Sequence, residues 1–492
     1  MLSTLKFRLP RIGVRRSIPA SSPRPVEISL QYETAVAKTN ARYLSYSIDI
    51  SVLAGGFWWE GSLGIRAGLG TLRVTPLRIK RRKLDRLVRA LGPAYLRVGG
   101  SEADKIHYFF PQFEEKDPLI LTKKQWRRLH AFVRRNNLKL IFTCKYGLFR
   151  RKHHGNWHGT ELEELLEYSK KKNFQIDVFE LGNELNAYWA FHGLTSQPGP
   201  KNLAQDYVTF AELVKQYYPE AKISGPGSAF WPKLGETIRP FTNLTENFLK
   251  HISLPLDIIN WHYYPFQSER TPFRTRAAKI KHLVDPKSFA DFGRYSNQLK
   301  ALRDNLQPQA EIWTGETGSA QCGGQPYLSD RWASSFWWAD QLGQGARLGQ
   351  KVMVRQALIS GDYGLIDRFT LKPRPDYWVS WIWQQMMGKT VYAAETNDPY
   401  VRAYLHQHRN GKDLALLLIN LSDKPKEFSL NHQLSIAESY VLTAPKLTSR
   451  KIRINNTKPS FNKGNVELKD FRGPAIQSGV PPYSISFSRV EP

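Results

Sequence analysis

The clearest pattern along this 492-residue chain is a recurrence of short apolar runs, each followed by a turn and an amphipathic stretch. The runs are rich in β-branched and aromatic residues, as strands buried on both faces are. From residue 43 onward they predict eight strands, over Tyr43–Asp49, Ala94–Val98, Leu138–Cys144, Ile176–Leu181, Lys222–Ser224, Asp257–His262, Glu311–Thr314 and Lys351–Ile359.

The stretches between these runs have helical periodicity. They predict helices over Lys83–Leu91, Gln125–Arg135, Glu161–Lys172, Ala204–Tyr218 and Arg331–Leu342. Eight strands alternating with helices predict an α/β fold of the (β/α)8 TIM-barrel type. A doubly wound open sheet is the alternative, because a count of strands does not prove that the sheet closes.

The pattern changes after a predicted helix over Tyr377–Met387. Short alternating runs separated by Asn, Gly, Pro and Lys then predict an appended C-terminal β-sandwich. Its expected strands are Tyr404–His408, Leu414–Ile419, Ser439–Leu442, Lys451–Ile454, Val466–Leu468 and Tyr483–Phe487. We therefore expect a flexible basic leader (1–38), a catalytic barrel (39–390) and a sandwich domain (391–492).

Composition narrows the classes of protein. The formal net charge of +28 predicts attraction to a polyanion, whether nucleic acid, anionic lipid or acidic polysaccharide. Metal and nucleotide motifs such as CxxC, HExxH and GxxxxGK are missing from the sequence, as is GxGxxG after a strand. No apolar run approaches the roughly 20 residues of a transmembrane helix. The two cysteines exclude a disulfide framework.

The first thirty residues carry six basic side chains and one acid, without the apolar core of a secretory signal. A flexible leader is our expectation. An organellar transit peptide remains open, because the segment is rich in Arg and Ser.

Polar residues mark the predicted strand ends, where TIM barrels carry their active sites. Two glutamates, Glu184 and Glu316, follow the fourth and seventh predicted strands. A carboxylate pair facing across a cleft is what glycoside hydrolysis requires, since one protonates the leaving oxygen while the other attacks the anomeric carbon or activates water. A salt bridge or a helix cap is the alternative role for either glutamate alone.

Several motifs resemble those of the heparanase-like β-glucuronidases, glycoside hydrolase family 79. The resemblance covers roughly residues 40 to 490. The motifs that carry it are Leu91–Gly100, Glu180–Asn186, Trp261–Tyr264, Trp313–Asp330 and Asp376–Trp378.

This resemblance implies that Glu184 is the general acid/base and Glu316 the nucleophile of a retaining double displacement. It implies no cofactor and no metal. It also implies substrate contacts from residues that match sugar-facing positions of the family, namely Asp49, Ser101, Asn183, His262, Tyr264 and Tyr363.

The sequence departs from the family after the nucleophile. Relatives have a Tyr and consecutive glycines there, whose backbone N–H groups can hold the substrate carboxylate, whereas this chain has Gln321, Cys322, Gly323 and Gly324. Backbone amides survive any side chain, so we expect Cys322 and Gly323 to contact the substrate. We also expect Arg270, from the basic Arg270–Lys281 segment, to line a groove for sulfated sugars. A solvated basic surface is the alternative for that segment.

The sequence as a whole predicts a retaining, endo-acting glycosidase for β-glucuronidic linkages in an acidic glycosaminoglycan such as heparan sulfate or heparin. An exo-acting β-glucuronidase and a non-catalytic polyanion-binding barrel are the alternatives. No recognition motif favours nucleic acid as the partner. We expect a monomer. The resemblance implies an extracellular or periplasmic location, although no signal peptide is readable.

Overall fold

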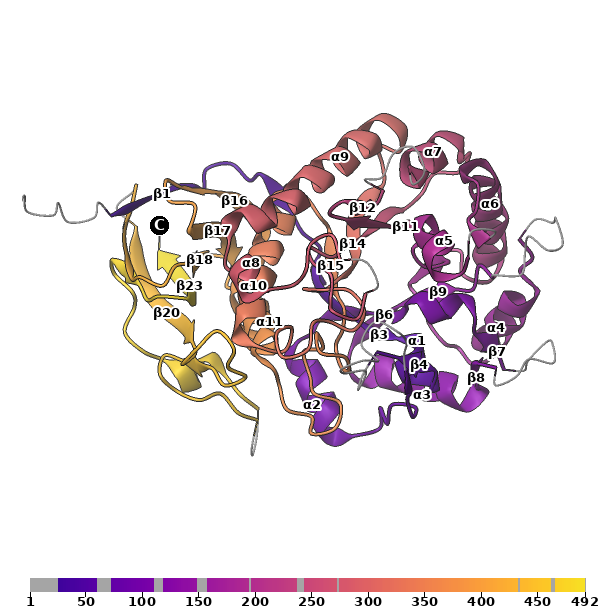
Figure 1. Cartoon of the computed structure of the whole chain (residues 1–492), viewed down its shortest axis with the longest axis horizontal. Helices are drawn as coiled ribbons and strands as arrows, with labels where there is room; N and C mark the ends of the chain where they lie inside the picture. The colour runs from indigo at the N-terminus through magenta and orange to yellow at the C-terminus, as the bar shows by residue number, and fades with distance from the viewer. Residues whose placement is uncertain are drawn as a thin grey trace, which may run out of the picture.

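The computed structural model describes residues 25–59, 72–109, 118–147, 157–193, 196–236, 243–271, 274–431, 434–461 and 465–491. A closed barrel surrounded by helices lies beside a second, ten-stranded sheet (Figure 1). In the described part of the chain, no helix has both the length and the apolar character needed to cross a membrane.

The barrel consists of eight parallel strands, and all eight were predicted. Neighbours pair in the order β10, β9, β6, β3, β15, β14, β13 and β11, and pairing of β10 with β11 closes the ring. Closure confirms the TIM barrel and excludes the open sheet. The strands are β3 (Leu44–Asp49), β6 (Ala94–Gly99), β9 (Leu138–Cys144), β10 (Val178–Leu181), β11 (Lys222–Trp231), β13 (Ile258–Tyr263), β14 (Glu311–Thr317) and β15 (Val352–Arg355).

Apolar side chains from six of these strands form a cluster separate from the main core. They pack side by side in the way that fills a barrel interior. The cluster contains Tyr95, Ile141, Val178, Ile258, Trp313, Val352 and Val354.

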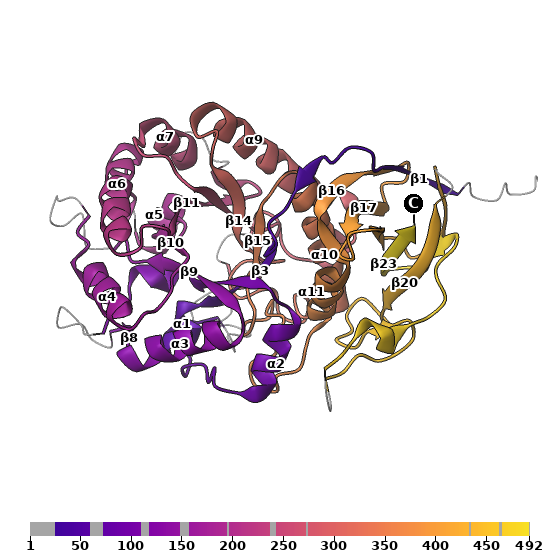
Figure 2. The same cartoon turned by 180° about the vertical axis from the view of Figure 1, so that it is seen from behind.

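Helices surround the strands, as the views from both sides show (Figures 1 and 2). The sequence predicted five helices of the barrel to within about five residues at either end, and it predicted α11 as well. The five are α2, α3, α4, α6 and α10. The helix α3 starts at a capping box in which Thr122 and Gln125 exchange side-chain and backbone hydrogen bonds. The main helices are α2 (Arg82–Ala90), α3 (Lys123–Arg135), α4 (Thr160–Lys171), α6 (Pro200–Tyr217), α7 (Leu244–His251), α9 (Ala290–Leu306), α10 (Trp332–Arg347) and α11 (Pro375–Met386).

Short elements occupy the loops that follow the barrel strands. They are α1 (Ile50–Ala54), β4 (Phe57–Trp58), β5 (Leu72–Arg73), η2 (Ser101–Asp104), β7 (His107–Tyr108), β8 (Ile120–Leu121), η4 (Leu185–Ala187), α5 (Tyr188–Phe191), β12 (Leu234–Gly235), α8 (Ile280–Leu283) and η6 (Pro286–Phe289).

The second sheet is mixed and has its own apolar cluster, consistent with an appended β-sandwich. One predicted strand, Val466–Leu468, is wrong, because the chain there leads into the 3-10 helix η7 (Leu468–Phe471). The strands of the sheet are, in spatial order, β21 (Arg453–Ile454), β20 (Ser435–Thr443), β23 (Ser484–Glu491), β18 (Leu414–Asn420), β17 (Val401–His408), β16 (Met387–Thr396), β1 (Val26–Gln31), β19 (Lys426–Leu430) and β22 (Gly479–Val480), with β2 (Ala37–Lys38) beside β16.

The strand β1 differs from the expected leader over residues 1–38. It pairs antiparallel with β16 and parallel with β19. Its alternate residues Val26, Ile28 and Leu30 are buried in the second sheet's core. The alternation is a strand pattern that the basic composition of this region concealed. Residues 1–24 lie outside the described part of the chain.

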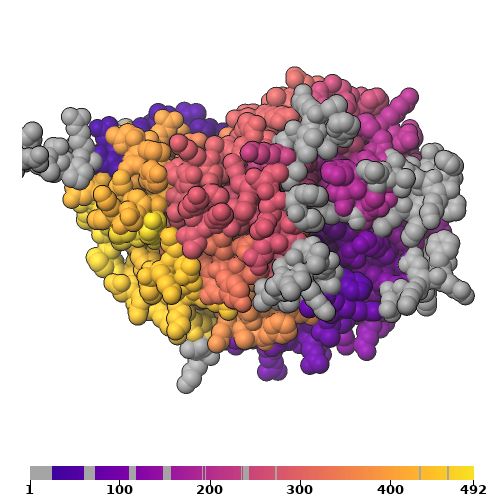
Figure 3. Space-filling model, in the orientation of Figure 1, coloured from indigo at the N-terminus to yellow at the C-terminus, as the bar shows by residue number. Residues whose placement is uncertain are grey.

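The second sheet packs on α10 and α11, which lie between it and the barrel (Figures 1 and 2). On the molecular surface the C-terminal segments, in yellow, form the end of the molecule opposite the magenta segments of the barrel (Figure 3). Asp340 of α10 accepts hydrogen bonds from Tyr404 Oη at 2.6 Å and from Arg402 Nε at 2.8 Å. The indole of Trp332 donates to the Tyr483 carbonyl at 3.1 Å. Because α10 is covered from both sides, nearly all of its residues are buried.

Candidate active site

The structure brings Glu184 and Glu316 together at the C-terminal ends of the barrel strands. Glu316 lies near the end of β14, and Glu184 follows β10 with a left-handed φ of 51°. One carboxylate oxygen of each glutamate and a ring nitrogen of His262 lie within 4.8 Å of one another. Retaining glycosidases hold their carboxyls about 5–5.5 Å apart and inverting ones about 6.5–9.5 Å apart. The separation therefore matches the retaining geometry.

Both oxygens of Glu316 accept short hydrogen bonds. Tyr264 Oη donates to Oε1 at 2.6 Å, and Arg97 Nη1 donates to Oε2 at 2.6 Å. Burial and the charge of Glu316 hold the pKa of Tyr264 well above its usual value, so this phenol remains a donor at neutral pH. These contacts fix the rotamer of Glu316 and the direction of both of its oxygens.

Arg97 is the centre of the network beneath the site. This guanidinium, 1% exposed, also donates to Glu180 Oε2 at 2.8 Å and to Asn183 Oδ1 at 3.0 Å. Glu180 in turn accepts from Thr143 at 2.7 Å and from Asn260 at 2.7 Å. A buried charge is tolerated when it is paired and hydrogen-bonded in this way.

Glu184 has a different environment. Its side chain lies beside His262, whose Nδ1 is 3.3 Å from Oε1. Burial and the charge of Glu316 raise the pKa of Glu184 well above its usual range, and Arg97 offsets this only in part. Burial and Arg97 lower the pKa of His262, which is neutral at pH 7. The raised pKa favours the protonated form of Glu184, which is the form that a general acid needs.

The backbone beside Glu184 is held by Asp104 of η2. Its Oδ2 accepts from the Asn183 N–H at 3.0 Å, and its Oδ1 accepts from the Tyr146 N–H at 3.0 Å. Burial raises the pKa of Asp104 to about 6. Asp104 thus joins the backbone of Asn183 to that of Tyr146, and this fixes the strand end that carries Asn183 and Glu184.

Asp49 and Ser101 lie at the neighbouring strand ends. The Asp49 carboxylate caps α1 by accepting from the Ser51 N–H at 2.8 Å. A side chain at Gly100 would overlap the other Asp49 oxygen, so only glycine fits there. Burial raises the pKa of Asp49 to about 8. Ser101 is half-buried and begins η2.

The loop after Glu316 has an unusual backbone. Cys322, Gly323 and Gly324 have consecutive positive φ values of 53°, 78° and 89°. The Gly323 carbonyl accepts from the Asp362 N–H at 2.6 Å, whereas the N–H groups of Cys322 and Gly323 have no hydrogen-bond partner among the described residues. Burial raises the pKa of the Cys322 thiol to about 12, so it is protonated. The two amides are available to a ligand.

Tyr363 and Arg270 surround this loop. The ring of Tyr363 lies 6.5 Å from that of Tyr264, centroid to centroid. The guanidinium of Arg270 is 1% exposed and contacts Asp362 at 2.6 Å and the Gly324 carbonyl at 3.0 Å. Arg270 was expected to bind sulfate in an open groove. Instead its side chain is buried and links two loops, because its guanidinium already contacts Asp362 and the Gly324 carbonyl.

Sequence reasoning missed Arg97, Glu180 and Asn260. Each is a charged or amide residue inside a strand that is otherwise apolar. Such a residue costs free energy unless it is paired, and that cost is the signal that could have identified all three. The cluster Glu184, His262 and Glu316 could also offer three ligand atoms to a metal ion. The guanidinium of Arg97 beside Glu316 makes a cation there less favourable.

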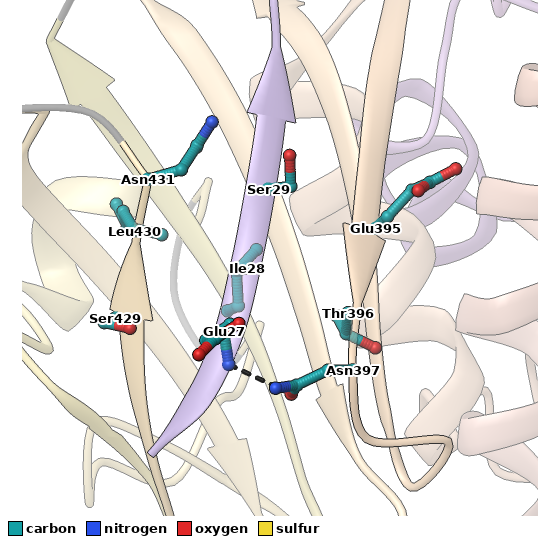
Figure 4. Close-up of a pocket in the computed structure, with 9 residues that line it drawn as sticks. All are labelled: Glu27, Ile28, Ser29, Glu395, Thr396, Asn397, Ser429, Leu430 and Asn431. Atoms are coloured by element: carbon teal, nitrogen blue, oxygen red, sulfur yellow. Dashed lines mark hydrogen bonds between the residues drawn. The ribbon is translucent and has the colours of Figure 1, made fainter. Parts of the chain in front are cut away.

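A hollow of about 510 Å³ lies on the second sheet and not at the barrel mouth (Figure 4). It is open, and residues of β1, β16 and the end of β19 line it, including Glu27, Ser29 and Glu395. None of the predicted site residues lines it, so it is separate from the glutamate pair.

Comparison with known proteins gives consistent matches. The sequence profile of the glycosyl hydrolase family 79 N-terminal domain matches residues 66–343. Heparanase from Bos taurus is 27% identical, with 82% of this chain and 83% of that protein covered. Hyaluronoglucuronidase from Hirudo nipponia is 25% identical, with 76% and 82% covered. Among solved structures, the GH51 arabinofuranosidase from Xanthomonas axonopodis pv. citri has a TM-score of 0.66 at 13% identity, covering 95% of this chain and 100% of that one.

Proposed function

The chain belongs to glycosyl hydrolase family 79, and from this premise we propose that it cleaves β-glucuronidic linkages within an acidic glycosaminoglycan, with retention of configuration. The observation that carries the proposal is the buried glutamate pair at retaining separation. The names of two relatives, heparanase and hyaluronoglucuronidase, support a uronic-acid polymer as the substrate.

In the proposed first step, Glu316 attacks the anomeric carbon as the bond to the leaving oxygen breaks. Glu184 gives its proton to that oxygen, so the leaving sugar departs as an alcohol and a glycosyl ester forms on Glu316. In the second step Glu184, now a carboxylate, takes a proton from water while the water oxygen displaces Glu316. The raised pKa of Glu184 supports this assignment.

The substrate carboxylate has a fitting partner in the loop after the nucleophile. We assign it to the N–H groups of Cys322 and Gly323, which have no partner among the described residues. Two amides at left-handed backbone positions form a concave anion site. We assign contacts with sugar hydroxyls to Asn183, Asp49 and Ser101. We also assign His262 and Tyr264 to the same subsite, since His262 contacts Glu184 and Tyr264 donates to Glu316.

The net positive charge of the chain favours endo action on heparan sulfate over exo action. A net charge of +28 attracts a long polyanion and raises its local concentration at the site. Mass spectrometry of products from a heparan sulfate octasaccharide tests the proposal. We expect shorter internal oligosaccharides. Release of monosaccharide alone from the non-reducing end would contradict endo action, and hyaluronan run in parallel shows which polymer is preferred.

A matched variant separates catalysis from binding. Glu316→Gln keeps the shape of the side chain and removes the nucleophile. We expect it to abolish turnover while heparin binding changes little. Unchanged turnover would show that Glu316 is not the nucleophile, and a non-catalytic binding protein would show no turnover in the wild type.

A further inference from the structure

Large apolar side chains gather in the loops of the catalytic face. In the described part of the chain eight such side chains are exposed, and six of them lie in loops that follow barrel strands. Exposed apolar side chains in the loops that surround a site are candidates for contact with a ligand. The six are Phe57, Leu72, Trp189, Ile280, Tyr327 and Phe369.

Trp189 is the one nearest in sequence to the proposed acid. It follows Glu184 by five residues, through η4 into α5, and is 41% exposed. At about 1.5–2.0 Å of rise per residue, these five residues cover about 8–10 Å. The leaving oxygen must lie within hydrogen-bond reach of Glu184. The leaving-group sugar therefore lies near the segment that carries Trp189.

The segment that carries Trp189 is firmly held. Asn186 exchanges two hydrogen bonds with the backbone of Ala229, at 3.0 and 2.8 Å. Tyr188 is fully buried, and its ring packs edge-on against Tyr146. Gln197 donates to the Leu185 carbonyl at 2.7 Å and accepts from the Trp189 N–H. An exposed indole on an anchored backbone is preorganised for a ligand, because little conformational entropy is lost on binding.

We propose that Trp189 is a specificity-determining residue that stacks against a pyranose ring of the leaving-group side. Pyranose rings present C–H faces, and the flat indole offers a large apolar surface to one. This inference rests on the proposed function and adds to it a preference for an oligosaccharide leaving group. Binding energy from that remote contact then contributes to kcat as well as to KM.

The test compares two substrates across three variants. The substrates are a glycosaminoglycan octasaccharide that the wild type cleaves and p-nitrophenyl β-D-glucuronide, which has no leaving-group sugar. For Trp189→Ala we expect the loss in kcat/KM on the octasaccharide to exceed that on the aryl glucuronide by about tenfold or more. Trp189→Phe keeps an aromatic face and should recover part of the difference. Tyr400→Ala is the matched control, since Tyr400 is 45% exposed but lies on the second sheet.

Equal losses of Trp189→Ala on both substrates, or no loss on either, would overturn the assignment of Trp189 while leaving the proposed function intact. The melting temperatures of all three variants show whether a loss reflects unfolding. A wild-type protein that cleaves neither substrate would overturn the proposed function, and the Trp189 assignment with it.

Discussion

At the scale of single residues, the site depends on one buried guanidinium. Arg97 contacts the proposed nucleophile, Asn183 and Glu180 at once. Its planar fork allows three acceptors to be held in fixed directions, which a lysine ammonium cannot reproduce. Arg97 is therefore a positioning residue, acting through Glu316 and Asn183.

For Arg97→Lys we expect kcat to fall by about 100-fold with a smaller change in KM, since a shift of the nucleophile by a fraction of a bond length has that effect. Steady-state kinetics on an aryl glucuronide measures it. Arg135→Lys is the control, because Arg135 also holds two acceptors through its guanidinium, in the helix α3 and not at the site. Its Nε donates to Asp85 Oδ1 at 2.9 Å and its Nη2 donates to the Ile79 carbonyl at 2.5 Å. Wild-type kcat in Arg97→Lys would show that the fork does not position Glu316.

Asp49 gives the second residue-scale prediction. Its pKa is raised to about 8 in the fold, against about 3.9 when unfolded. Because the folded pKa is the higher one, the stabilising contribution of the proton is complete below about pH 4 and is lost as pH rises toward 8.

We therefore expect the free energy of unfolding of the wild type to fall relative to Asp49→Asn between about pH 4 and 8, by at most about 1.4 kcal/mol per pH unit. Asparagine can still cap α1, which isolates the effect of the charge. Urea unfolding of both proteins across this range measures the difference. Parallel stability curves would contradict a raised pKa for Asp49.

The sequence predicted part of the site at this scale. Glu184 and Glu316 come directly after apolar runs. Because the C-terminal ends of all strands of a TIM barrel lie on the same face, the sequence predicted that the two glutamates lie close together. Arg270 could not be placed in the same way, because its partner Asp362 is 92 residues away and comes close only in the folded chain. The sequence did not predict the backbone angles of Cys322 and Gly323, and these angles decide which way their N–H groups point.

At the scale of elements, a bulge in β14 aims the nucleophile. The register with β13 advances from Trp261–Thr314 to His262–Glu316, so Gly315 is an extra residue. Bulges near active sites turn the next side chain in this way. A side chain at Gly315 would overlap the amide of Asn260.

We expect Gly315→Ala to lower stability by about 1–3 kcal/mol, as overpacking does, and to lower kcat by about 100-fold because Glu316 is displaced. Thermal unfolding and kinetics measure the two effects. Gly199→Ala is the control, since an added methyl there meets open space. Normal kcat in a folded Gly315→Ala protein would mean that the bulge does not set the position of Glu316.

The barrel strands were predictable because strands buried on both faces read as continuous apolar runs. The bulge was not, since it appears only when two strands are paired. The strand β1 was missed because its partners, β16 and β19, follow it by more than 350 residues.

At the scale of the whole molecule, barrel and second sheet share the helices α10 and α11. The chain enters the second sheet with β1, forms the barrel and returns to the same sheet with β16. The loops that follow the barrel strands carry six exposed large apolar side chains in the described part of the chain. The net charge of the whole chain is +28, and this charge favours an acidic polymer as the substrate.

We propose that this barrel forms a covalent glycosyl intermediate on Glu316. Incubation with a 2-deoxy-2-fluoro-β-glucuronyl fluoride, followed by peptide mapping by mass spectrometry, detects such an intermediate. We expect one glucuronyl adduct on the peptide that contains Glu316, and none after Glu316→Gln. An adduct on another carboxylate, or an inverted anomer among the first products by NMR, would contradict it.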